Sequence, residues 1–259
     1  MPSHRAEVGL NHYLLIIEYD GSRYAGWQKQ PGMITIQSEL EKAAAVVLGK
    51  PVKSTAAGRT DKGVHARGQV VTLSAPANYP PKRFLLALNS LLPKDIAVTG
   101  VRKANAGSNA RFDASGKVYR YYIWNKTYRS VWRKDRWHVA RPLDLGLMKS
   151  AVQFIVGKHD FRAFEARGST QCSKICNLER IKITNHGGEI TLTFAADRFL
   201  YKMVRNITGT LVDVGLGRIA PDALIGILDG KNRRHAGRTA PSHGLFLEKI
   251  EGGKFGDLS

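Results

Sequence analysis

Cysteine is scarce in this sequence: the 259 residues include two, Cys172 and Cys176. Two cysteines cannot build the disulfide framework that stabilises small secreted domains. A structural zinc site needs four ligands, and this pair at a four-residue offset supplies only two. We therefore expect two ordinary thiols in a reducing compartment.

Long apolar runs are also missing. No stretch approaches the roughly 20 apolar residues that a membrane-spanning helix requires, and residues 1–12 lack the apolar core of a signal peptide. These absences predict a soluble, cytoplasmic protein with no membrane partner.

Acidic residues are few relative to basic ones. The chain has 21 Asp and Glu against 40 Lys and Arg, a formal net charge of +19. Such a charge favours a polyanionic partner but does not separate RNA from DNA or anionic lipid. The hydrophobic fraction of 43% excludes a disordered basic tail, and the length allows either one large domain or two lobes.

The first hundred residues are expected to form four strands and two helices. The apolar run at 12–19 ends at the turn signal Asp20-Gly21 and indicates a buried strand. Thr35 suits a helix N-cap, and Gly49 suits the end of that helix. The further expected elements are strands at 52–55, 69–73 and 96–101 and a helix at 81–92. This order, β-α-β-β-α-β, is the split βαβ order of ferredoxin-like and RRM-like folds.

The second half repeats this order with one extra helix. Its expected elements are strands at 117–125, 178–184, 189–194 and 245–250 and helices at 144–156, 201–214 and 221–228. Gly187-Gly188 indicates a hairpin, and the small, polar residues 104–109 mark a boundary. We therefore predict an α+β fold of two pseudo-symmetric lobes, residues 1–106 and 107–259. Each lobe has a mainly antiparallel sheet, and an RNA-binding active-site cleft lies between them.

The segment 57–70 (AGRTDKGVHARGQV) carries the most chemical information. Asp61 follows Arg59 by two residues, and His65 and Arg67 come after it. A loop of this kind fixes a carboxylate in a cationic setting, which keeps the carboxylate ionised and nucleophilic. The plainer interpretation is a tight Asp-Lys-Gly turn with a solvated basic rim.

The stretch GRTDKGVHARGQ at 58–69 resembles the signature of the tRNA pseudouridine synthase A family. Six further blocks match that family in the same order: YDGSRYAGWQ at 19–28, ALNSLLPKDI at 87–96, ARF at 110–112 with YRY at 119–121, GKHDFRAF at 157–164, FLYKMVRNITGTL at 199–211 and TAPSHGLFL at 239–247. The resemblance covers almost the whole chain. The sequence departs from the family at Asn109 and Lys202, where His is usual or frequent, and at Phe246, where Tyr is common.

The resemblance implies that the protein isomerises uridine to pseudouridine at positions 38 to 40 of the anticodon stem-loop of tRNA, as a homodimer and without a cofactor or metal. It assigns the nucleophile to Asp61 and the guiding of the flipped base to Arg59. Tyr119 would stack on the uracil, with its hydroxyl available for proton removal at C5. Arg205 would pair with Asp61, and Leu245 would form an apolar wall of the uracil pocket.

The residues by themselves leave other interpretations open. Tyr119 and Leu245 also suit a core, Arg205 an exposed helix face, and Arg59 a phosphate contact alone. The whole chain could be a non-catalytic RNA-binding module. It could also be a metal-dependent nuclease, although that class needs several clustered acids, and Asp61 has no acidic neighbour in its loop.

Two further segments of the sequence are rich in basic residues. Residues 128–137 interleave Arg and Lys with Tyr and Trp, and residues 231–238 hold five basic or potentially basic side chains. Both suit contacts with phosphates and exposed bases, or a solvated surface. His65 and His159 lack metal-ligand spacing, and we expect structural roles for them.

Overall fold

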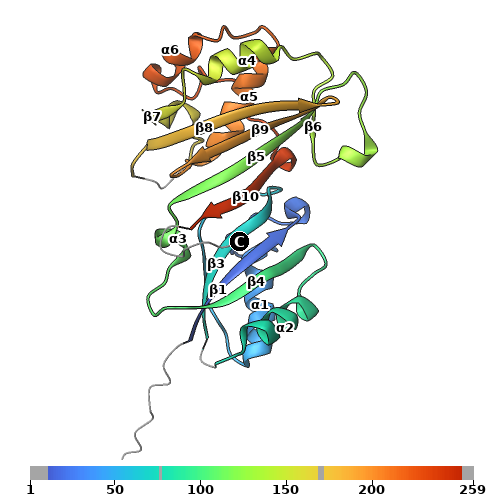
Figure 1. Ribbon diagram of the computed structural model, residues 1–259, viewed down its shortest axis with the longest axis vertical. Helices are drawn as coiled ribbons and strands as arrows, with labels where there is room; N and C mark the ends of the chain where they lie inside the picture. Colours follow the sequence, from blue (N-terminus) through green and yellow to red (C-terminus); the bar gives the residue numbers. More distant parts are fainter. Residues whose placement is uncertain (1–10, 76–77, 169–171, 253–259) are drawn as a thin grey trace, which may run out of the picture. The chain divides into compact units, whose positions relative to one another are not determined.

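The computed structural model describes residues 11–75, 78–168 and 172–252, which form two compact units (Figure 1). The first unit comprises the described residues up to Ala114 together with Gly252, and the second spans Ser115–Glu251. Both are mixtures of helices and mainly antiparallel strands, so a mixed α and β fold is confirmed. None of the helices in the described residues has the length and apolar composition of a membrane-spanning segment.

The first unit contains one sheet and two long helices. Its elements are β1 (Asn11–Tyr19), η1 (Gly21–Arg23), α1 (Ile36–Leu48), β2 (Ser54–Ala56), β3 (His65–Ala75), α2 (Pro81–Leu91), β4 (Ile96–Ala104) and α3 (Ala110–Asp113). The strands lie in the order β4-β1-β3-β2, and every neighbouring pair is antiparallel.

Sequence patterns explain these elements. Alternate residues of β1 are fully or nearly buried, and Tyr13 packs edge-on against Phe84 of α2 with ring centroids 5.0 Å apart. Helix α1 begins with a capping box in which Thr35 and Ser38 exchange hydrogen bonds. It ends at Gly49, whose φ of 69° suits a residue without a side chain. Both ends of α1 are therefore where the sequence predicts them.

The second unit contains a longer sheet and three helices, which Figure 1 shows together on one side of the strands. Its elements are β5 (Gly116–Trp124), η2 (Val131–Arg133), β6 (Trp137–His138), α4 (Leu145–Val152), β7 (Gly157–Asp160), η3 (Phe161–Phe164), β8 (Ile175–His186), β9 (Glu189–Ala196), α5 (Met203–Gly215), α6 (Ala223–Gly230), η4 (Ser242–Gly244) and β10 (Leu245–Glu251). The strands lie in the order β10-β5-β9-β8-β7, and β6 pairs with β5 in parallel. The four strands expected from the sequence thus have the same spatial order here as in the first unit: fourth, first, third, second.

Several local expectations were wrong. Strand β3 begins at His65 rather than Gln69, so the loop before it is shorter than predicted. Strands β6 and β7 were not predicted, and α4 ends at Val152 rather than continuing to 156. The hairpin at Gly187-Gly188 is confirmed, with φ values of 61° and 96° at the two glycines.

Candidate active site

Asp61 lies on the short loop between β2 and β3. Its main-chain oxygen accepts a hydrogen bond from the N–H of Val64 at 3.1 Å, and Gly63 has a φ of 74°. These features close a tight turn over residues 61–64. Along the loop Arg59 is exposed, Thr60 is buried and Asp61 is half-buried. The turn expected from composition is therefore present, and Asp61 remains partly accessible on it.

Thr60, the residue before Asp61, is fixed from two directions. Its Oγ1 lies 2.7 Å from the hydroxyl of Tyr19, and its main-chain oxygen accepts from the N–H of Trp27 at 3.0 Å. Burial raises the pKa of Tyr19 to about 12, although hydrogen bonds with Thr60 and Gln69 act in the opposite direction. The Tyr19 hydroxyl is thus neutral at physiological pH and available for hydrogen bonding.

Gln69 fixes the start of the same loop. The side chain is fully buried, its Nε2 donates to the main-chain oxygen of Gly58 at 2.6 Å, and its Oε1 accepts from the Gly58 N–H at 3.4 Å. The N–H of Ala57 donates to the main-chain oxygen of Val70 at 2.8 Å. Both sides of Asp61 are therefore held to the sheet, which limits the positions that its carboxylate can take.

Two glycines allow close main-chain packing against the loop. A Cβ on Gly26 would lie 2.7 Å from the oxygen of Thr60, and one on Gly21 would lie 2.0 Å from the oxygen of Val64. Gly26 also has a φ of 101°, which side chains disfavour. Gly21 and Gly26 therefore pack directly against the main chain of the Asp61 turn.

Asp95 in turn holds residues 20–24. Its main-chain oxygen accepts from the Asp20 N–H at 2.9 Å, and its carboxylate accepts from the Tyr24 hydroxyl at 2.6 Å and the Arg23 Nε at 2.8 Å. The sequence blocks 19–28, 87–96 and 58–69 are thus joined in one structure around Asp61. Sequence reasoning matched these blocks to a family but did not foresee the supporting roles of Tyr19, Thr60 and Asp95. Tyr19 and Thr60 lie within three residues of the turn glycines Gly21 and Gly63, which is the sequence signal that could have pointed to them, whereas Asp95 has no such signal.

His65 belongs to β3 and not to the loop. Its side chain is buried, and its Nδ1 accepts from the Gly21 N–H at 3.3 Å and lies 3.1 Å from an Asp20 carboxylate oxygen. These contacts join the 20–24 segment to β3. Across the described residues, no group of three or more His, Cys, Asp and Glu side chains is arranged to hold a metal ion.

Tyr119 and Leu245 lie in the second unit, on adjacent strands. Tyr119 of β5 is opposite Leu247 of β10, and Tyr121 is opposite Leu245, so these side chains share one face of the sheet. Tyr119 is 7% exposed and packs edge-on against Phe199 with centroids 5.1 Å apart. Leu245 is also buried. Both side chains thus contribute to the packing of the second unit.

Arg205 lies on the first turns of α5 and is half-buried. Its Nε donates to the main-chain oxygen of Ala240 at 2.8 Å, and the Ala240 N–H donates to the Arg205 oxygen at 3.0 Å. Tyr121 donates from its hydroxyl to the oxygen of Pro241 at 2.8 Å. Burial raises the pKa of Tyr121 strongly, and the charge of Arg205 opposes this effect. Arg205, Tyr121 and Leu245 are therefore linked through residues 240–245, whereas Arg59 and Asp61 lie in the first unit.

The basic segment 231–238 is partly engaged inside the second unit. Arg238 donates from Nη2 to the Asp213 Oδ1 at 2.9 Å, and Arg218 donates from Nη1 to the same oxygen at 2.9 Å. Arg233 is half-buried, whereas Lys231 and Arg234 are exposed. Not all of these cations are therefore available to a nucleic acid in this conformation.

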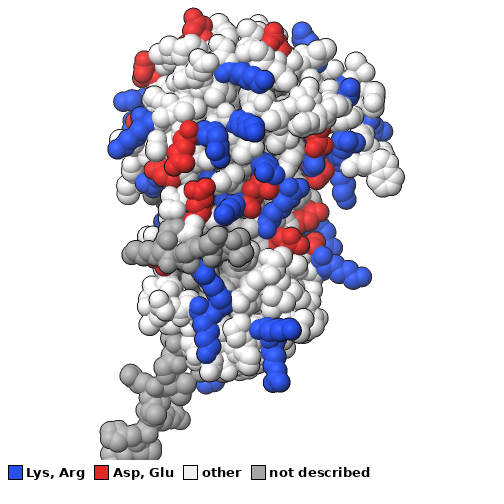
Figure 2. Space-filling view, viewed as in Figure 1, with Lys and Arg blue, Asp and Glu red and all other residues white. Residues whose placement is uncertain are grey.

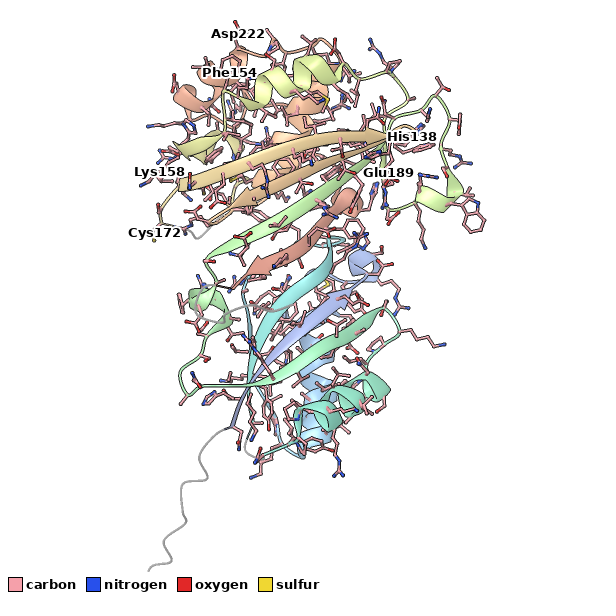
Figure 3. All side chains as sticks on the ribbon, viewed as in Figure 1. His138, Phe154, Lys158, Cys172, Glu189 and Asp222 are labelled. Carbon is pink, nitrogen blue, oxygen red and sulfur yellow. The ribbon has the colours of Figure 1, made fainter. Side chains whose placement is uncertain are left out.

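The other basic segment, 128–137, presents apolar side chains to solvent. Trp132 is 90% exposed, yet the segment is anchored: Glu189 accepts from the Nε of Arg133 at 3.3 Å and of Arg136 at 3.1 Å. Figure 3 labels Glu189 and His138 near the same end of the second unit's sheet. An ordered, basic segment with an exposed indole suits stacking on an unpaired base. Figure 2 shows acidic side chains interspersed among the basic ones on the drawn face of the second unit, so the positive charge there is not one continuous stripe.

The sequence is similar to a known protein family. The family model described as tRNA pseudouridine synthase matches residues 15–113 and 151–251. These ranges include Arg59, Asp61, Arg205 and Leu245, whereas Tyr119 lies between them.

Individual relatives are similar in sequence to this chain over nearly its whole length. The tRNA pseudouridine synthase A of Bacillus subtilis is 41% identical over 239 residues, covering 90% of this chain and 96% of the relative. The enzyme of the same name from Moorella thermoacetica is 42% identical over 240 residues, covering 92% and 98%. That from Acetivibrio thermocellus is 40% identical over 237 residues, covering 91% and 97%.

Proposed function

The chain belongs to the tRNA pseudouridine synthase family, and from this premise we propose that Asp61 is the nucleophile with which it isomerises uridine in tRNA. The protein is thus an isomerase that modifies tRNA. The observation that carries the assignment of Asp61 is its place on a loop whose neighbours on both sides are held by buried hydrogen bonds. Asp61 is half-buried and follows an exposed arginine by two residues. A fixed, ionised carboxylate is what nucleophilic catalysis requires.

The reaction needs no external group. The N1–C1′ glycosidic bond breaks, the uracil rotates, and a C5–C1′ bond forms, while a proton leaves C5 and N1 gains one. Oxidation states balance without an added oxidant or reductant, so no cofactor is required. Asp61 can serve by attacking C1′ or by adding to C6 of the ring, and the present assignment holds for both routes.

The remaining roles follow the family resemblance. The target base must leave the stack at a cost of a few kcal/mol, and we assign its guidance to the exposed guanidinium of Arg59. Tyr119 and Leu245 provide the uracil pocket, and Arg205 pairs with Asp61 and favours its charged form. The arrangement proposed is a cleft between two pseudo-symmetric split-βαβ lobes.

The proposed substrate is the anticodon arm, at positions 38 to 40, and the proposed assembly is a homodimer in the cytoplasm, where tRNA is found. The net charge of +19 supports a polyanionic substrate. Mapping pseudouridine in a tRNA transcript tests the position, and light scattering of the purified protein tests the dimer. Modification confined to another arm of tRNA contradicts the first proposal.

The decisive experiment replaces Asp61 with Asn, which keeps the shape and removes the nucleophile. We expect no pseudouridine by mass spectrometry or by tritium release from C5, with tRNA affinity unchanged. Asp222→Asn is the matched control, because Asp222 is an exposed carboxylate of the second unit without a side-chain cap bond, and it should retain full activity (Figure 3).

Three other results contradict the proposal. Pseudouridine formation by the Asp61→Asn protein contradicts the assignment of the nucleophile, whereas tRNA binding without pseudouridine in wild type and variant alike favours the RNA-binding module. RNA chain cleavage that EDTA abolishes favours the metal-dependent nuclease.

A further inference from the structure

A polar cluster connects α5 to the segment that precedes β10. We name it the Asn206 cluster, and its members are Asn206, Arg233 and Thr239. The Oδ1 of Asn206 accepts from the Thr239 hydroxyl at 2.6 Å and from the Arg233 Nη2 at 3.0 Å. The same Arg233 nitrogen donates to the Thr239 Oγ1 at 3.0 Å, which closes a triangle of three hydrogen bonds. On its other side, the Asn206 Nδ2 donates to the main-chain oxygen of Phe164 at 2.7 Å.

The cluster fixes the main chain that contacts Arg205. Thr239 is followed by Ala240, whose oxygen accepts from the Arg205 Nε at 2.8 Å, and by Pro241, whose oxygen accepts from the Tyr121 hydroxyl at 2.8 Å. Asn206 is itself the residue after Arg205 on α5. Both ends of the contact between Arg205 and Ala240 are therefore adjacent in sequence to a member of the cluster.

The composition of the cluster favours one arrangement of residues 239–241. Asn206 is fully buried, and its side chain has three hydrogen-bond partners in the described structure: Phe164, Arg233 and Thr239. Burial lowers the pKa of Arg233, whose acceptors in the described residues are the neutral oxygens of Asn206, Ala236 and Thr239. A buried amide such as that of Asn206 is stable only when its hydrogen bonds are satisfied, so the cluster specifies one position for the chain around Thr239 rather than a range of positions.

We propose that Asn206, Arg233 and Thr239 are positioning residues for the isomerisation, because they hold the 239–241 segment that orients the guanidinium of Arg205 and the ring of Tyr121. This inference rests on the proposed function, in which Arg205 acts on Asp61. The cluster does not touch the reacting atoms. Loss of the cluster displaces Arg205 in the transition state, and this displacement lowers kcat. Binding of tRNA is unchanged, because tRNA is bound over a large surface.

Thr239 offers the sharpest test, because it lies at the surface and its substitution leaves the buried Asn206 in place. Thr239→Val keeps the side-chain shape and removes the hydroxyl, whereas Thr239→Ser keeps the hydroxyl. Thr99→Val is the matched control, because Thr99 is also an exposed threonine whose hydroxyl donates a hydrogen bond, in this case to the main-chain oxygen of Ile16 at 3.3 Å in the first unit. Steady-state kinetics on a tRNA transcript and thermal melting are measured for all four proteins, wild type included.

We expect Thr239→Val to lower kcat about 10- to 100-fold with KM unchanged within about twofold. Thr239→Ser restores kcat to near the wild-type value, and Thr99→Val matches the wild type. A rise in KM at constant kcat overturns the proposal, because the segment would then bind RNA directly. Equal loss in the Ser and Val variants, or loss of kcat only in proportion to the unfolded fraction, also overturns it. An inactive wild type refutes the proposed function itself, whereas an active wild type with a fully active Thr239→Val protein refutes this inference alone.

Discussion

The hydroxyl of Tyr19 lies 2.7 Å from the Oγ1 of Thr60, the residue that precedes Asp61. Both side chains are buried, so this contact connects the end of β1 to the proposed nucleophile through a single peptide unit. The position of Asp61 thus depends on residues that are not themselves part of the chemistry.

Tyr19→Phe should lower kcat for pseudouridine formation about 10- to 100-fold, because Thr60 loses a partner and the Asp61 turn can shift. The loss of one buried hydrogen bond should also destabilise the fold by about 0.5–1.5 kcal/mol. Tyr13→Phe is the control, since Tyr13 is a buried tyrosine of the same strand whose hydroxyl contacts Tyr79 instead. A similar loss of kcat in both variants would indicate general destabilisation.

Gly26→Ala should lower kcat by a similar or larger factor. The new Cβ would lie 2.7 Å from the Thr60 oxygen and 3.1 Å from the main-chain carbon of Asp61, so the turn has to move. Gly32→Ala separates this effect from backbone strain, because Gly32 also has a positive φ, 71°, but a Cβ there meets no atom within 4 Å. Activity assays on both variants decide the point, and equal activity of the two argues against a steric role for Gly26.

Asp213→Asn should destabilise the second unit in a pH-dependent way. Burial by itself would raise the pKa of Asp213, but the hydrogen bonds from Arg238 and Arg218 outweigh it and lower the pKa below its ordinary value of 3.8. A carboxyl group with a lowered pKa contributes stability above its unfolded-state value and loses that contribution as pH falls through the folded-state value. The difference in unfolding free energy between wild type and variant should therefore be largest near pH 7 and shrink below about pH 4.

Urea denaturation at several pH values measures this difference. Asp229→Asn serves as a control, because Asp229 is exposed on α6. A difference for Asp213→Asn that is constant with pH would mean that the ion pairs with Arg238 and Arg218 contribute nothing to stability.

Affinity for tRNA should fall steeply with salt, because the chain carries a net charge of +19. Each phosphate that is neutralised contributes a slope of roughly 0.7–0.9 in the plot of log affinity against log salt concentration. Fluorescence polarisation with labelled tRNA measures the slope. A response that does not depend on salt would contradict the electrostatic part of the proposal.

The secondary structure was largely predictable where local patterns decide it. Thr35 and Gly49 delimit α1, and Gly187-Gly188 forms the hairpin between β8 and β9, because caps and turns depend on a few adjacent residues. Strand β7 was missed, since its residues Gly157–Asp160 are polar and become a strand only by pairing with β8. Local sequence does not report a partner that is distant in the chain.

The sequence suggests candidate site residues, but it does not predict the contacts that hold them. Asp61 and Arg59 stand out by composition, whereas the roles of Gln69 and Asn206 depend on contacts with main-chain groups far away in sequence. Helix α5 illustrates the limit. Its polar residues Asn206, Thr208 and Thr210 are fully buried, although an isolated helix pattern would place such residues toward solvent.

The partners that orient Arg205 and Tyr121 are the main-chain oxygens of Ala240 and Pro241. Exchanging either side chain leaves its carbonyl group in the peptide, so conventional mutagenesis at these two positions cannot delete the acceptor. Replacing the amide link by an ester lowers the acceptor strength of the carbonyl before it, and semisynthesis could introduce one there. The chemistry of this enzyme can thus be sensitive to atoms that every possible amino-acid sequence retains.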